Sequence, residues 1–254
     1  MNMHAARAAF GLDSLKTILG ISVLAIRWDD AVALLNRLIA ERRFTKVSFL
    51  NAHNANIACS DPDFAEALDD FLILPDGIGV DLAATILYGA PFPDNLNGTD
   101  LTPAVLDHAS CPLRIFLLGS PEGVAEQAAT VLAARYPRHQ IVGTQHGFFT
   151  EGEEEALVAR IVASGANLLL VGMGHPRQEM FAARHWRRIA GATMCIGAFL
   201  DFTAGRVSRA PGWVRAARAE WLYRLAIEPR RMARRYLIGN IVFLKNRLTE
   251  RRRA

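Results

Sequence analysis

Short apolar runs alternate with segments of helical periodicity along most of the chain. Apolar runs predict strands, and apolar positions spaced three and four residues apart predict amphipathic helices. The predicted strands cover residues 20–26, 46–51, 72–74, 114–118, 141–144, 167–171 and 192–196. The predicted helices cover residues 29–42, 79–88, 121–135 and 178–189. This alternation predicts an α/β fold with a Rossmann-like, mostly parallel sheet and helices on both faces.

Length and composition suit one large globular domain with an appendage. The chain has 254 residues, of which 51% are hydrophobic and 21% charged, and this excludes disordered, collagen-like and small disulfide-stapled proteins. Three widely spaced cysteines favour neither a disulfide framework nor a zinc site, and they indicate a reducing, cytoplasmic environment. No run approaches the roughly 20 apolar residues that cross a bilayer. Residues 1–15 lack the features of a signal peptide and are expected to form a mobile leader.

Charge is divided unevenly between the body and the C-terminal segment. Residues 206–254 contain thirteen arginines and one lysine against three glutamates, a net charge of +11, whereas residues 1–205 carry −7. Tryptophans and aliphatic residues are interleaved with these arginines at helical spacing, which is typical of a basic amphipathic helix on an anionic membrane. Packing of the apolar positions on the body and binding of nucleic acid are the alternatives. We therefore predict a catalytic α/β domain over residues 1–205 and an amphipathic helical membrane-association appendage over residues 206–254.

Polar motifs follow two of the predicted strands, at the edge where ligands bind in open parallel sheets. Asn51 begins an asparagine-rich segment after one strand, and Asp76 follows another within Pro75-Asp76-Gly77-Ile78-Gly79. The asparagines offer donors and acceptors to a sugar or phosphate, or they serve as turn and capping residues. Asp76 is placed either to accept a proton from an attacking hydroxyl or to cap the following helix.

Glycines and aromatic residues mark three further strand ends. The turn at Gly119 opens a helix, where free amide groups favour an anion, although it lacks the G-x-G-x-x-G spacing. Phe148 and Phe149 follow another strand and either stack on a nucleobase or pack in the core. Residues 172–179 combine glycines, an amide and charges at one helix entrance and form the strongest local signal for a site. The polar loop at residues 94–100 ends in capping residues before a further helix.

Candidate metal ligands lack the necessary arrangement. The single D-x-D sequence, Asp61-Pro62-Asp63, is placed at the start of a helix, where capping explains it. The seven histidines show no ligand spacing. We therefore expect that the protein requires neither a metal nor another cofactor.

Taken together, these motifs resemble the bacterial WecG/TagA/CpsF family of glycosyltransferases. The segments that carry the resemblance stand in the family's order: 50–52, 74–79, 97–100, 117–119, 147–149, 172–179 and 197–201. The resemblance implies an inverting, metal-independent enzyme that transfers a hexose or N-acetylhexosamine from a UDP-sugar to a polyprenyl-diphosphate-linked saccharide in surface polysaccharide biosynthesis. It also implies a peripheral position on the cytoplasmic face of the plasma membrane, reached through the basic tail, and it allows a homo-oligomer.

The resemblance assigns roles to individual residues. Asp76 corresponds to the family's proposed general base, and Asn51 and Gln178 correspond to contacts with the donor sugar or phosphate. Phe148 is expected to stack on the base, and Asp201 to hydrogen-bond the uridine. The nucleotide-binding set further contains Gly119, Gly172 and Gly174. Contacts with the acceptor, the phosphate or the membrane are expected at Asn97, Thr99, Arg206, Arg209 and Arg215.

One position departs from the family's pattern. Phe49 stands two residues before Asn51, where family members often carry threonine, so a hydroxyl contact near the donor sugar is not expected here. The His53-Asn54-Ala55-Asn56 segment is closer to exopolysaccharide-assembly members, which favours glucose or a related hexose over N-acetylmannosamine.

Two other function classes fit parts of the sequence. A nicotinamide-dependent oxidoreductase would use a similar sheet, but no glycine fingerprint is followed by an acidic residue about 20 positions later. A nucleic-acid-binding module would use the basic tail and would bind with steep salt dependence.

Overall fold

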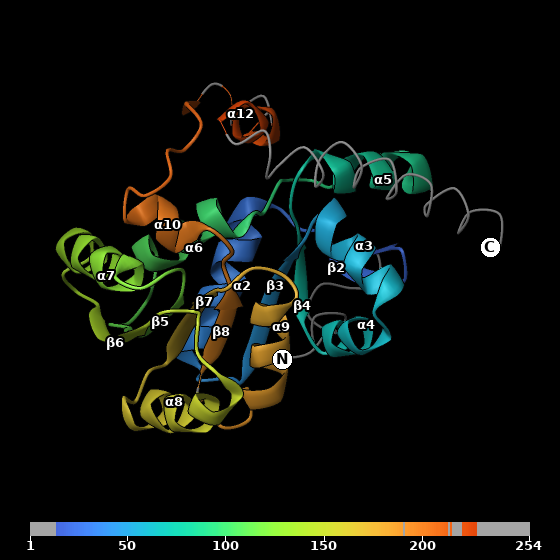
Figure 1. Ribbon diagram of the computed structural model, residues 1–254. Coiled ribbons are helices and arrows are strands. Elements are labelled where there is room, and N and C mark those ends of the chain that lie inside the picture. The colour runs from blue at the N-terminus through green and yellow to red at the C-terminus, as the bar shows by residue number, and fades with distance from the viewer. Residues whose placement is uncertain (1–13, 190, 213, 215–219, 228–254) are drawn as a thin grey trace.

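The computed structural model describes residues 14–189, 191–212, 214 and 220–227. Its main sheet has six strands, all parallel, in the order β4-β3-β8-β7-β5-β6 (Figure 1). In chain order these strands are β3 (Thr45–Leu50), β4 (Leu72–Pro75), β5 (Arg114–Gly119), β6 (Gln140–Gln145), β7 (Leu168–Gly172) and β8 (Ala192–Cys195). The predicted parallel α/β sheet is therefore confirmed.

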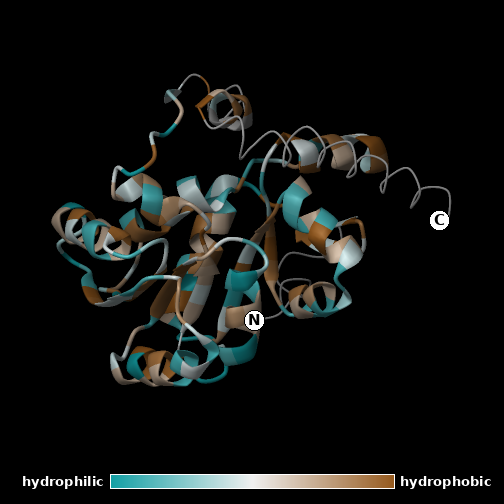
Figure 2. Cartoon of the chain, viewed as in Figure 1, coloured by the Kyte–Doolittle hydropathy of each residue, from teal (hydrophilic) through white to brown (hydrophobic). Residues whose placement is uncertain are grey.

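Helices cover both faces of this sheet. One face carries α2 (Trp28–Ala40), α6 (Gly98–Asp107), α7 (Val124–Arg135) and α10 (Phe199–Thr203). The other face carries α3 (Ala52–Ser60), α4 (Pro62–Asp69), α5 (Ile78–Tyr88), α8 (Glu151–Ala163) and α9 (Arg177–His185). Strands enclosed in this way must be apolar on both sides, and every residue of β7 is buried. Figure 2 accordingly shows the strands mainly in the brown of hydrophobic residues.

The first predicted strand belongs to a separate hairpin. Residues 20–26 contain β2 (Ile21–Leu24), but this strand pairs antiparallel with β1 (Leu15–Ile18) and does not join the parallel sheet. The reversal occurs at Leu19 and Gly20, whose φ angles of 50° and 80° are those of a tight hairpin turn. The mobile leader predicted over residues 1–15 overlaps this hairpin, because Leu15 already lies in β1. Residues 1–13 lie outside the described residues.

Only part of the predicted appendage falls within the described residues. There α12 (Glu220–Ile227) is helical, with Leu222 and Ile227 about half exposed, while residues 228–254 lie outside the description. Among the described helices none is both long and apolar enough to cross a membrane.

Candidate active site

Asn51 links the ends of β3 and β4. Its side-chain Oδ1 accepts hydrogen bonds from the backbone N–H groups of His53 at 3.0 Å and Asn54 at 3.3 Å, so Asn51 caps α3. These two donors fix the orientation of the amide, because the oxygen must face them. The amide nitrogen Nδ2 then faces the site and donates to Asp76 Oδ2 at 3.1 Å. The structure thus confirms Asn51 as a helix cap, and the same side chain also holds Asp76.

Asp76 is held by the backbone on either side of it. Its N–H donates to the carbonyl oxygen of Leu50 at 2.8 Å, and the N–H of Gly77 donates to Asn95 Oδ1 at 2.9 Å. Gly77, with φ of 92°, is the residue that caps α5, and no side chain caps this helix. The interpretation of Asp76 as a helix cap is therefore wrong, and its half-buried carboxylate instead accepts the hydrogen bond from Asn51.

His175 completes this group from the loop after β7. Its Nε2 lies 3.5 Å from Asn51 Nδ2, and its Nδ1 lies 2.8 Å from Glu179 Oε1, one helical turn further along. A carboxylate against Nδ1 favours the tautomer that carries its proton there. His175 Nε2 is then an acceptor directed toward Asn51, and one chain of contacts joins Glu179, His175, Asn51 and Asp76.

Glu179 is a fully buried carboxyl group beneath the site. Besides His175, its Oε1 accepts hydrogen bonds from Ser48 Oγ at 2.9 Å and Gln178 Nε2 at 2.8 Å. Its Oε2 has no hydrogen-bond partner among the described residues. The pKa of the Cys195 thiol on β8 is raised well above its usual value. Burial of the thiol is the main cause, and the nearby Glu179 is a further one. The sequence indicated no individual role for Ser48, His175 or Glu179. His175 and Glu179 nevertheless lie within residues 172–179, the strongest local signal for a site.

Gln178 lies in the same buried layer. Its side chain is fully buried, accepts from the N–H of Gly174 at 3.2 Å, and donates to Glu179 and, at 3.4 Å, to the carbonyl oxygen of Cys195. Its amide is thus engaged within the protein. Gly174, with φ of 77°, turns the loop so that His175 and Gln178 can both reach this network.

A second part of the strand-end edge is built on closely packed glycines. A Cβ added to Gly119 would lie 2.3 Å from the carbonyl oxygen of Gly172, so the ends of β5 and β7 approach as only glycine permits. Ser120 follows, and its Oγ donates to Asp201 Oδ2 at 2.9 Å. Arg206 Nη1 lies 2.9 Å from the other oxygen of Asp201. The structure therefore gathers Gly119, Gly172, Asp201 and Arg206 at one place.

The two phenylalanines after β6 have different environments. Phe149 packs edge-on against Phe181, with ring centroids 5.9 Å apart. Phe148 is 68% exposed. Arg177 Nη2 donates to the carbonyl oxygen of Gly147 at 2.9 Å and ties this loop to α9. Core packing thus explains Phe149, while Phe148 offers an uncovered ring at the strand-end edge.

A third group joins Arg209 to the start of α6. Asn97 caps α6 by accepting from the N–H of Asp100 at 3.0 Å, and Thr99 Oγ1 donates to Asn97 Oδ1 at 2.6 Å. Arg209 Nη2 lies 2.8 Å from Asp100 Oδ1 and 3.3 Å from Thr99 Oγ1. The structure therefore brings Asn97, Thr99 and Arg209 together; Arg215 lies outside the described residues.

Phe49, the departure noted above, belongs to the hydrophobic core and packs against Gly98 at the start of α6. Its ring is buried, and a Cβ on Gly98 would lie 2.7 Å from it. Phe49 thus fills the space beside the start of α6, and Gly98 leaves room for its ring. At the position where family members often carry a threonine hydroxyl, this chain therefore has an apolar side chain packed in the core.

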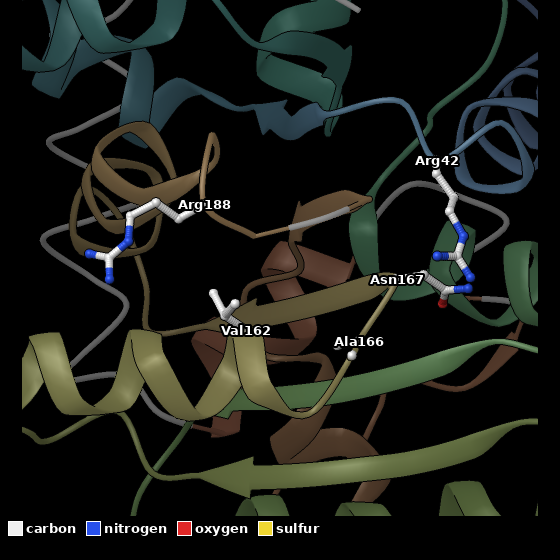
Figure 3. A pocket seen from close by; sticks show the side chains of 6 residues that line it. Arg42, Val162, Ala166, Asn167 and Arg188 are labelled. Atoms are coloured by element: carbon white, nitrogen blue, oxygen red, sulfur yellow. The ribbon is translucent and has the colours of Figure 1, made fainter.

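Within the described ranges, no three histidine, cysteine, aspartate or glutamate side chains form a cluster suited to a metal ion. A small pocket (Figure 3) is lined by Arg42, Val162, Gly165, Ala166, Asn167 and Arg188. It lies beside the amino end of β7, opposite the strand ends described above, and contains none of the predicted site residues.

Comparison with known families decides the identity of this arrangement. The glycosyl transferase WecG/TagA/CpsF family matches residues 16–254, nearly the whole chain. The chain belongs to this family. It is therefore a glycosyltransferase of polysaccharide biosynthesis, and the motifs that suggested the resemblance converge on one edge of its sheet.

Proposed function

We propose that this glycosyltransferase transfers a hexose or N-acetylhexosamine from a UDP-sugar to a polyprenyl-diphosphate-linked saccharide with inversion and without a metal. The observation that carries the proposal is the Asp76 carboxylate, held at the strand ends by Asn51 at 3.1 Å. The hydrogen bond from the neutral Asn51 amide orients this carboxylate at the end of the sheet. The carboxylate is thus suited to act as a general base.

The proposed reaction is a single displacement. Asp76 takes the proton of an acceptor hydroxyl while that oxygen forms a bond to the anomeric carbon of the donor. The bond from this carbon to the diphosphate oxygen breaks, and UDP leaves with the electron pair. Attack opposite the leaving group inverts the anomeric centre. Asn51 holds the base in place, and His175, oriented by Glu179, fixes the second N–H of the Asn51 amide.

We assign the nucleotide to the glycine-rich part of the edge. The close approach of Gly119 and Gly172 packs the ends of β5 and β7 together beneath this part of the edge, and the exposed ring of Phe148 has a face for stacking on a base. Asp201 and Ser120 then offer polar partners to the uridine. We give Gln178 a positioning role, because its buried amide is engaged with Glu179 and Gly174.

Without a metal, protein groups must balance the charge of the departing diphosphate. Arg206 is one candidate: its side chain is 52% exposed and its partner Asp201 belongs to the proposed nucleotide site. We place the acceptor beside Asn97 and Thr99, where Arg209 enters from the appendage. The rest of the basic tail would hold the enzyme on the cytoplasmic membrane face.

A ligand screen tests this proposal. The melting temperature of the full-length protein is measured with UDP, UDP-glucose, UDP-N-acetylglucosamine, UDP-N-acetylmannosamine, GDP-mannose and NAD, each with and without a chelator. A ligand that binds only the folded state at about 100 times its Kd stabilises by roughly 2.7 kcal/mol. We expect uridine compounds to raise the melting temperature equally in chelator, with the ranking identifying the sugar. Stabilisation by NAD alone, or by uridine compounds only with a divalent metal, would contradict the proposal.

A further inference from the structure

The solvent-facing side of α5 carries an aliphatic stripe. Ile78, Leu82 and Ile86 are 47%, 46% and 37% exposed. Their spacing of four residues places them on one face of the helix, over about 12 Å of its length. Soluble proteins seldom leave such a contiguous apolar row uncovered.

The same side of α5 lacks charge. Asp81, the one carboxylate side chain within α5, is buried and accepts a hydrogen bond from the N–H of Phe92 at 3.2 Å. A surface helix of a soluble protein usually presents charged or polar residues to water. The outer face of α5 is instead aliphatic, with Thr85 beside the stripe.

The hairpin holds α5 in position from its far end. Tyr88 Oη donates to the carbonyl oxygen of Thr17 at 3.0 Å and accepts from the Thr17 N–H at 2.8 Å. Lys16 Nζ donates to the carbonyl oxygens of Ala90 and Pro91, both at 3.0 Å. The stripe is therefore presented by a helix anchored at its C-terminal end.

The stripe begins beside the proposed base. Ile78 is two residues after Asp76, so the apolar face continues directly from the site. If the acceptor hydroxyl belongs to a saccharide on a polyprenyl diphosphate, it cannot move further from the bilayer than the diphosphate and sugar extend. The protein surface around Asp76 must therefore meet the membrane interface.

We propose that the Ile78–Leu82–Ile86 face of α5 inserts into the headgroup–acyl boundary of an anionic bilayer and places Asp76 at the membrane surface. This inference rests on the proposed function for the position of the acceptor. In Figure 1, α5 and α12 lie on the same upper side of the molecule, and Leu222 and Ile227 of α12 are also about half exposed. The arginine-rich sequence beyond α12 supplies the positive charge that anionic lipids attract.

Vesicle partitioning of the full-length protein tests this contact. Leu82→Glu/Ile86→Glu is compared with Val131→Glu/Val162→Glu, which makes the same change in charge at valines 42% and 46% exposed on α7 and α8. The two variants have the same net charge, and the uncharged variant Leu82→Gln/Ile86→Gln separates loss of the apolar contact from local repulsion between glutamates and anionic lipid. We expect the α5 variant to partition about tenfold or more weakly than the control into vesicles of phosphatidylglycerol and phosphatidylcholine. Equal partitioning of the two variants would overturn the proposal.

Three additional measurements keep the outcomes separate. Melting temperature shows whether each variant is folded, and Leu82→Gln/Ile86→Gln replaces the α5 variant if it is not. Sedimentation tests whether the face binds a second copy: a dimer that the α5 variant dissociates, with vesicle binding unchanged, overturns the membrane assignment. Partitioning is measured without nucleotide or acceptor, so a failure to bind UDP would count against the proposed function and leave the membrane result standing.

Discussion

Removing the buried carboxyl of Glu179 should destabilise the fold severely. Glu179→Ala leaves the Ser48 hydroxyl and the Gln178 amide, both fully buried, without the acceptor they now contact at 2.9 and 2.8 Å. An unsatisfied buried donor costs about 1–3 kcal/mol, and the vacated volume adds to this. Relief from burying a carboxylate offsets part of the loss. We therefore expect a decrease of about 3–5 kcal/mol in the free energy of unfolding.

The isosteric Glu179→Gln variant separates shape from charge. Glutamine retains an oxygen for Ser48, His175 and Gln178 but loses the charge-assisted part of these bonds. Its NH2 takes the place of Oε2, which has no partner among the described residues, so we expect a decrease of about 1–2 kcal/mol. Glu126→Ala is the surface control, because exposed Glu126 accepts a hydrogen bond from Thr144 at the surface, and we expect a change within about 0.5 kcal/mol. Urea unfolding followed by circular dichroism measures all three. If Glu179→Ala changed stability no more than Glu126→Ala, Glu179 would not be satisfying the buried donors.

Three further predictions concern the base, the glycine contact and the appendage. Asp76→Asn should lower turnover about a hundredfold or more while retaining the UDP-induced thermal shift, because asparagine still offers an oxygen to the Asn51 amide. A near-normal rate of UDP release would show that Asp76 is not the general base. Gly119→Ala should lower the free energy of unfolding by about 3 kcal/mol or more, since its Cβ would lie 2.3 Å from a backbone oxygen. The control is Gly89→Ala, which is also at positive φ but in open space and should lower this free energy by only about 1–2 kcal/mol. Equal losses of the two variants in urea titrations would contradict the steric argument. Arg209→Ala should lower kcat/KM for the lipid-linked acceptor about tenfold, the usual scale of a lost charge-assisted contact, without changing UDP binding; unchanged steady-state kinetics would show that this arginine is structural.

Local pattern was sufficient for most of the sheet and for the edge that holds the site. Strands enclosed by helices on both faces are continuous apolar runs, so β5, β7 and β8 are visible in the sequence. Parallel strands place their carboxyl ends together, so Asn51 and Asp76 were expected at one edge. The hairpin was misassigned because a short apolar run does not reveal whether its neighbour will be the main sheet or the preceding residues. Leu19 and Gly20 decide this through the turn that they form.

The sequence by itself determined the fold class, the division of charge and the segments that meet at the site, because hydrophobic periodicity and composition are local properties. Tertiary structure alone decided which atoms meet. Ser48 and Glu179 are separated by 131 positions along the chain and contact each other only because α9 packs on the face of β3. Tertiary packing likewise leaves Phe149 half-buried against Phe181 and Phe148 exposed, and it leaves Ile78, Leu82 and Ile86 of α5 partly exposed. Contacts of this kind depend on which elements are neighbours in space, and no local periodicity encodes that.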